Sequence, residues 1–301
     1  MTNLKKLLLL ALVTSNCLLA DVSVMPFIGA IKYDNSLIKS LKDNSVFLGL
    51  EADISKHNYL LEANYKYSNI KYKDTLNLQS LIQHDLSMIY TSIHPNYALK
   101  IGGHYINNNE STNFRDLGTG YIGIAGLEGY NSFNQMKLSY GLEAFYSVYP
   151  TAHSDTSTAY TLLIDVVQFT PYLKYSLVLN QSLRNDISFK VNAIASTQYK
   201  DPGYLSYEFT DTVVYDKFYA ILKVFTGEMK SGVKDGGVTV MNTKDLYTSA
   251  YDFKAGYYLS PTLALDFSYG VNYYQEYNAA TLTLSPEGQN SVGMISLSYD
   301  Y

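Results

Sequence analysis

Apolar and polar residues alternate strictly along many segments of the chain. Within residues 262–275, one set of alternate positions is wholly apolar or aromatic, while its complement is small or polar except for one tyrosine. The same period of two recurs in residues 58–69, 134–148, 185–198 and 245–259. Because successive side chains of a strand point to opposite sides, this period predicts strands with one apolar and one polar face, not helices.

Segments of about ten residues with this pattern are typical of a membrane barrel, which has lipid outside and a polar lumen inside. A closed sheet is also the only arrangement of strands whose backbone groups are all paired within hydrocarbon. The pattern therefore predicts an all-β protein whose residues 21–301 form one antiparallel transmembrane β-barrel domain.

The connections between these segments differ in length. Short turns rich in Asn, Ser and Pro occupy residues 55–58, 94–96, 131–134, 180–185 and 260–261, and long polar stretches alternate with them. Short turns are typical of the periplasmic end of a barrel and long loops of the extracellular end. This alternation predicts twelve strands: about 22–33, 45–54, 58–69, 80–93, 97–107, 117–129, 134–148, 160–179, 185–198, 245–259, 262–275 and 291–301.

The stretch 199–244 leaves the strand count open. It is predicted as one long extracellular loop, but "YLSYEF" alternates, and "VVYDKFYAILKVF" fits either a strand or the apolar stripe of a helix. An extra hairpin here would give fourteen strands, whereas a helix could fold over the mouth. The glycine-rich run 227–237 lacks the GxxxxGK[ST] pattern of a phosphate-binding loop.

The first twenty residues have the features of an export signal. A basic start, "MTNLKK", precedes an apolar run of only seven residues, far short of the roughly 20 that a membrane helix needs. We expect a signal peptide over residues 1–20. An alternative is a lipoprotein signal acylated at Cys17, although Asn16 fits such cleavage poorly. With cleavage after Ala20, the sole cysteine leaves with the signal.

Composition narrows the possible partners. Removing Lys5 and Lys6 from the 22 basic residues leaves 20 against 27 acidic residues, a net charge near −7 that disfavours a nucleic-acid partner. The chain has 31 tyrosines and no tryptophan. Tyrosine favours strands and suits the boundary between lipid and water, because its ring is apolar and its tip polar. The five histidines show no metal-ligand spacing, so no metal or cofactor is expected.

The last strand carries the most specific signal. Apolar residues alternate up to a terminal aromatic, at Ile295, Leu297, Tyr299 and Tyr301. With this strand, the chain resembles Gram-negative outer-membrane β-barrel proteins, porin-like but of no particular subfamily. The resemblance implies a bacterial outer-membrane location, with lipid as the surroundings and periplasmic chaperones and the barrel-assembly machinery as partners. These four residues would then form the assembly signal; the oligomeric state stays open.

Function depends on the lumen and the loops. We predict lumen positions for charged residues of both signs and one histidine: Glu51, Asp53, Glu62, Lys66, Lys100, His104, Lys137, Glu143, Lys174, Lys190, Asp252, Lys254 and Asp266. These residues could pair across strands for structure, or they could line a weakly selective aqueous pathway. The second reading predicts a small porin-like channel for passive diffusion of hydrophilic solutes.

Two other functions are weighed against the channel. A non-conducting barrel could present its long loops, above all 199–244, to a partner, as an adhesin or receptor does. A barrel hydrolase would need a histidine beside a serine or acid on one face, but His153 and Ser154, like His84 and Asp85, are sequence neighbours and point apart. We therefore expect no enzyme and no catalytic residues.

Overall fold

The computed structural model describes residues 21–34, 42–73, 80–109, 119–153, 161–180, 182–196, 203–229, 233–234, 239–240, 245–278, 283–284 and 286–300. The strands are β1 (Asp21–Asp34), β2 (Lys42–Lys56), β3 (Tyr59–Tyr72), β4 (Leu81–Ile93), β5 (Tyr97–Asn109), β6 (Thr119–Phe133), β7 (Met136–His153), β8 (Thr161–Asn180), β9 (Leu183–Ser196), β10 (Tyr204–Tyr215), β11 (Phe218–Met229), β12 (Val233–Lys234), β13 (Thr239–Val240), β14 (Asp245–Ser260), β15 (Leu263–Asn278), β16 (Thr283–Leu284) and β17 (Gly288–Asp300).

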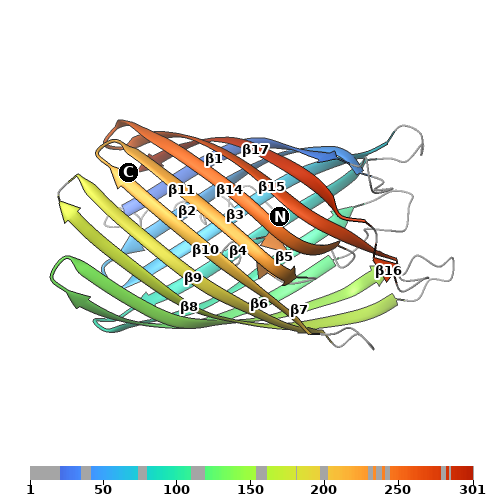
Figure 1. The fold of residues 1–301 in the computed structure, drawn as a ribbon, viewed down its shortest axis with the longest axis horizontal. Coiled ribbons are helices and arrows are strands. Elements are labelled where there is room, and N and C mark those ends of the chain that lie inside the picture. Colours follow the sequence, from blue (N-terminus) through green and yellow to red (C-terminus); the bar gives the residue numbers. More distant parts are fainter. Residues whose placement is uncertain are drawn as a thin grey trace, which may run out of the picture.

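Fourteen of these strands form a closed antiparallel barrel, and each pairs with its neighbours in the chain (Figure 1). The barrel closes where β1 pairs with β17, with Phe27 opposite Ser296. The short strands β12 and β13 pair only with each other, and β16 pairs with the end of β15. The predicted all-β membrane-barrel fold is confirmed. The described part of the chain holds no helix of the length and apolar character that a membrane crossing requires.

The prediction of twelve strands is wrong, and the alternative of fourteen is correct. β10 and β11 form a full hairpin of the wall, paired on their outer edges with β9 and β14. The helical reading of this stretch is wrong too. The sequence left strand and helix undecided here because Phe225 on the inner face is as apolar as Leu222 on the outer face. The two faces of β11 therefore do not alternate clearly between apolar and polar residues.

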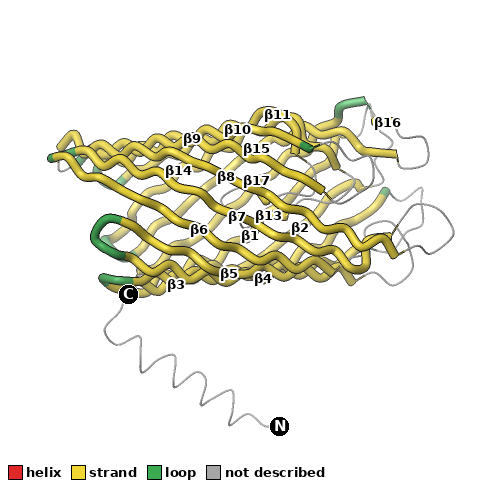
Figure 2. The backbone as a smooth tube through the Cα atoms, turned by 90° about the horizontal axis from the view of Figure 1, so that it is seen from below, coloured by secondary structure: helices red, strands yellow, loops and turns green. Residues whose placement is uncertain are grey.

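Tight turns gather at one end of the barrel (Figure 2). Five turns lie where the sequence predicts them, and a sixth joins β10 to β11. Asn134 and Asp216 adopt positive φ, 52° and 51°, in two of these turns, a conformation that Asn and Asp tolerate better than most residues. At the opposite end, consecutive wall strands are separated by the long connections of the sequence, 35–41, 73–80, 110–118, 154–160, 197–203, 230–244 and 279–287.

The outer face is an apolar belt. Alternate side chains on every wall strand are large, apolar and exposed, such as Leu265 on β15 at 47%, whereas its neighbour Asp266 is buried inside. Such a belt is stable only against hydrocarbon, since soluble proteins rarely expose a continuous apolar patch of this size. Members from around the barrel are Ile28, Leu48, Leu86, Leu99, Leu127, Leu142, Leu173, Phe189, Phe209, Leu222, Phe253, Leu265, Ile295, Leu297 and Tyr299.

Two stretches with sequence predictions lie partly or wholly outside the described residues. The expected signal peptide, residues 1–20 with Cys17, is one of them. Of the proposed assembly signal, Ile295, Leu297 and Tyr299 lie exposed on the outer face of β17, and Tyr301 is outside the described range. Their role in assembly stays a prediction.

Candidate functional site

The inner wall carries rows of residues that cross three strands. In the first row, Tyr219 on β11 lies opposite Gly256 on β14, which lies opposite Asp266 on β15. Gly256 has no side chain, and the Tyr219 ring occupies the space where a Cβ would stand. The ring therefore reaches across β14, and its hydroxyl donates a hydrogen bond to Asp266 Oδ1.

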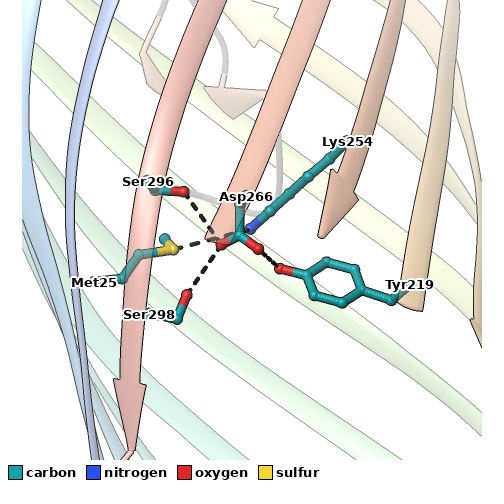
Figure 3. A network of polar contacts seen from close by, with 6 residues as sticks. All are labelled: Met25, Tyr219, Lys254, Asp266, Ser296 and Ser298. Carbon is teal, nitrogen blue, oxygen red and sulfur yellow. Dashed lines mark hydrogen bonds and ion pairs between the residues drawn. The ribbon is translucent and has the colours of Figure 1, made fainter. Parts of the chain in front are cut away.

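Asp266 is the centre of a cluster that joins four wall strands (Figure 3). Ser296 and Ser298 on β17 donate to its Oδ2 at 3.2 and 3.0 Å, and Lys254 Nζ on β14 lies 3.4 Å from the same oxygen. The side chain of Asp266 is fully buried. A buried charge is tolerated when it is paired and hydrogen-bonded, and here tyrosine, serine and lysine donors all meet the carboxylate.

A second row repeats this arrangement on the other side of the barrel. Tyr172 on β8 lies opposite Gly141 on β7, which lies opposite Glu128 on β6. The Tyr172 ring again fills the space over the glycine, and its hydroxyl donates to Glu128 Oε2 at 2.8 Å. Lys174 Nζ lies 3.6 Å from that oxygen and 5.0 Å from the centre of the Tyr172 ring.

Further ion pairs connect neighbouring or next-neighbouring strands on the inner face. Lys100 Nζ on β5 lies 2.6 Å from Glu143 Oε1 on β7, above Gly126 of the intervening strand. Lys66 on β3 pairs with Asp85 on β4 at 3.2 Å. Such cross-strand pairs stabilise the wall and also fix the positions of the charges that face the lumen.

Neutral side chains extend the polar surface across β8, β9 and β10. Asn192 accepts hydrogen bonds from Gln168 and Thr170 and donates to Ser206 and Glu208, at 2.9–3.4 Å. All five residues lie on the inner face, and Asn192 is buried. Because each amide atom of Asn192 has a partner, this ladder costs little to bury.

All thirteen predicted lumen residues lie on the inner face, but the structure brings only some of them together. Lys100 joins Glu143, and Lys254 joins Asp266. Three of the others have a polar partner outside the predicted set: Glu51 accepts a hydrogen bond from Asn64, Lys66 pairs with Asp85, and Lys174 pairs with Glu128. Lys137 lies over the Tyr130 ring, and Asp252 lies opposite Gly270. Asp53, Glu62 and Lys190 lie on β2, β3 and β9, respectively. That these residues line a pathway for a solute is a proposal.

His104 differs from the other predicted positions. Its side chain is only 4% exposed, and neither ring nitrogen has a hydrogen-bond partner within the described part of the chain. It lies between Ser87 on β4 and Ile122 on β6, next to the apolar cluster of Ile89, Ile122, Ile124 and Phe145. The described residues contain no group of three side chains able to hold a metal ion.

A second apolar cluster lines the inner face toward the end with the long connections. It consists of Val166, Ile194, Tyr204, Phe225, Met229, Leu246 and Ala250, on strands β8–β11 and β14. The inner wall thus carries buried apolar clusters as well as charged and polar side chains.

Sequence reasoning missed several members of the inner wall. Glu128 was missed because "GIAGLEGY" has small residues on both faces, so its alternation shows no polar side. Glu208 was missed because its segment was read as a loop. Tyr172 and Tyr219 were missed because tyrosine fits the lipid face equally well. A glycine that lies between an aromatic residue and an acid on the two neighbouring strands would indicate such a row. Finding it requires knowledge of the strand register, which the sequence alone does not provide.

Comparisons with known proteins agree with this architecture. The solved structure of the CymD monoaromatic hydrocarbon channel is similar with a TM-score of 0.54 at 10% identity, covering 93% of this chain and 88% of that one. CdiB from Acinetobacter baumannii gives 0.52 at 10% identity, covering 93% and 60%, respectively. The deltaS2 mutant of the TodX monoaromatic hydrocarbon channel gives 0.50 at 9% identity, covering 93% and 89%.

The chain has the fold of a bacterial outer-membrane β-barrel. The exposed apolar belt agrees with this, and the predicted outer-membrane location is confirmed at the level of the fold. No protein-family model and no curated protein matches the sequence.

Proposed function

We propose that this barrel is a channel for the passive diffusion of small hydrophilic solutes across the outer membrane. The fold that it shares with the CymD and TodX channels supports a transport role. Its size supports it too, because eight-stranded barrels are filled by side chains and sixteen-stranded ones leave an aqueous channel. Fourteen strands lie nearer the second case.

The accessibility of the inner lysines carries the proposal. The side chain of Lys174 is 47% exposed although it points into the barrel, and those of Lys66, Lys100 and Lys254 are 24–28% exposed. This exposure requires water-sized space beside them. Because ammonium groups at membrane depth need water or a counter-ion, the space next to these lysines is best explained as a wet pathway.

The charge pattern favours weak selectivity. Lysines and carboxylates alternate around the inner wall, so that one sign does not dominate the positions described above. A pathway of this kind would pass small polar solutes of either charge, with the most accessible cation, Lys174, biasing it toward anions.

The CymD and TodX structures are monoaromatic hydrocarbon channels, which supports a second candidate, a channel for apolar solutes. Uptake into liposomes separates the two candidates: a polar sugar enters through the first kind of channel and is excluded by the second.

Planar-bilayer recording of the refolded protein tests the proposal. We expect stable conductance steps, and a reversal potential in a KCl gradient that moves toward cation selectivity in Lys174→Glu. Lys217→Glu, in the exposed turn between β10 and β11, is the matched control and should leave the reversal potential unchanged. Protein that is folded by its gel mobility before boiling yet carries no current would contradict the channel.

A further inference from the structure

The outer wall has a gap in its apolar belt that packing does not explain. Gly103 on β5 and Gly123 on β6 lie directly opposite each other, and both face outward like their strand neighbours Ile101 and Tyr121. A Cβ at Gly103 would meet only the Ile122 carbonyl oxygen at 3.4 Å, and one at Gly123 only the Tyr146 carbonyl oxygen at 4.0 Å. Neither glycine has a positive φ.

Several other glycines of the wall have evident reasons. Gly141 and Gly256 make room for tyrosine rings, and Gly227 adopts a φ of 105°. Glycine within a strand is destabilising, and it commonly marks a bulge, a bend or a place where another molecule approaches closely. The pair Gly103 and Gly123 is of that kind.

The two glycines form the floor of a groove of about 410 Å³. Met88 on β4 and Tyr146 on β7 lie in the same cross-strand row and form its sides. Both side chains are at least half exposed on the lipid-facing surface, so the groove opens outward and not into the lumen. Its volume falls within the range of roughly 300–1,000 Å³ that ligand sites occupy.

The groove has one apolar end and one amphipathic end. Tyr105 and Tyr121 close it on the side of the long connections, with ring centres 5.3 Å apart. The Tyr146 hydroxyl donates to Asp165 Oδ2 at 3.1 Å, which places a carboxylate on the same side. Tyrosines with polar tips and a charged neighbour are typical of the boundary between hydrocarbon and headgroups.

We propose that this groove holds an acyl chain of a membrane lipid as a specific site, with the lipid headgroup at the tyrosine end. The groove is recessed in the apolar belt and continuous with it, so hydrocarbon chains already surround it. A chain lying over the paired glycines contacts backbone on its inner side and side chains on both flanks, and these contacts favour its binding. The site is independent of whether the lumen conducts.

Fluorescence quenching tests the site, because the chain has no tryptophan. Tyr121→Trp places a single indole at the groove, and Tyr269→Trp places one at an outward-facing tyrosine of β15 beside a single glycine, Gly293. Both variants are refolded into vesicles of phosphatidylethanolamine and phosphatidylglycerol in which an increasing fraction of the phosphatidylethanolamine carries dibrominated acyl chains. We expect stronger quenching of the groove indole in Tyr121→Trp than of the reference indole in Tyr269→Trp at the same low fraction of brominated lipid.

Filling the groove supplies the decisive comparison. Adding Gly103→Ile and Gly123→Ile to the Tyr121→Trp protein should reduce its quenching to the level of the Tyr269→Trp protein, while adding Gly293→Ile should not, since a Cβ at Gly293 meets nothing within 4 Å. Equal quenching of the two indoles, or quenching that filling leaves unchanged, overturns the site. A dimer in the vesicles that dissociates when the groove is filled also overturns it, because a second copy would then be the occupant.

Discussion

The two tyrosine–glycine–carboxylate rows of the inner wall share one architecture and differ in their access to water. In both, a tyrosine ring crosses a glycine to reach an acid, and a lysine pairs with that acid. Around Asp266 the carboxylate is fully buried and Lys254 is 24% exposed, whereas around Glu128 the corresponding values are 21% and 47%. The difference comes from β17, whose Ser296 and Ser298 cover Asp266.

The comparison shows that a charge on the inner face is not by itself evidence of a pathway. The Asp266 carboxylate is a structural element of the wall, because donors from three strands satisfy it and its side chain is fully buried. The Glu128 cluster keeps its cation open to the lumen. Accessibility, not charge, separates the two roles.

The largest expected effect comes from removing the buried acid. Asp266→Ala leaves Lys254, Tyr219 and two serines without their common acceptor, and breaking a buried pair in this way costs about 3–5 kcal/mol. We expect a loss of that size in the free energy of unfolding, measured by denaturant titration in lipid vesicles. Asp266→Asn, which keeps an acceptor oxygen, should lose less. A loss below about 1 kcal/mol for the alanine variant would contradict the structural role.

The next effect tests the two faces of the strand that carries Asp266. Leu265→Arg would place a charge in the exposed apolar belt, at a cost of about 2–4 kcal/mol near the midplane. Ser268→Arg, on the inner face of the same strand, should be tolerated in a wet lumen. The same unfolding assay compares them, and equal losses for both variants would show that the faces are assigned wrongly.

A smaller effect tests the glycine on which each row depends. Gly256→Ala and Gly141→Ala would drive a methyl group into the Tyr219 and Tyr172 rings, respectively, and overpacking of this kind costs about 1–3 kcal/mol. Gly293→Ala is the control and should be neutral or slightly stabilising. If the two row variants behave like this control, the rings do not depend on the glycines.

The smallest expected effect distinguishes the solvent-accessible row at Glu128 from the buried row at Asp266. Lys174→Met removes the accessible cation but leaves Glu128 bound to the Tyr172 hydroxyl. Because the ion pair is exposed, we expect a loss of at most about 1 kcal/mol in unfolding free energy. A loss as large as that of Asp266→Ala, measured under the same conditions, would mean that both rows are structural.

Much of the fold could be predicted from alternation alone, and most of the candidate site could not. Leu265 and Asp266 sit on opposite faces as their period requires, and the five turns lie at their polar residues. Alternation fails where both faces have the same character, as around Phe225 in β11 and Glu128 in β6. It also says nothing of which residues meet across strands, so the rows through Gly141 and Gly256 became visible only with the register.

The pairing of β1 with β17 gives the order of synthesis a chemical consequence. The four strands that meet at Asp266, β11, β14, β15 and β17, are the last four wall strands of the chain, and two of its donors stand on the last of them. Until that strand docks, the carboxylate lacks both serine hydroxyls and the edge of β1 lacks its partner. Sealing the cylinder therefore also completes the hydrogen bonds of Asp266, whose counter-charge on Lys254 is already supplied by β14.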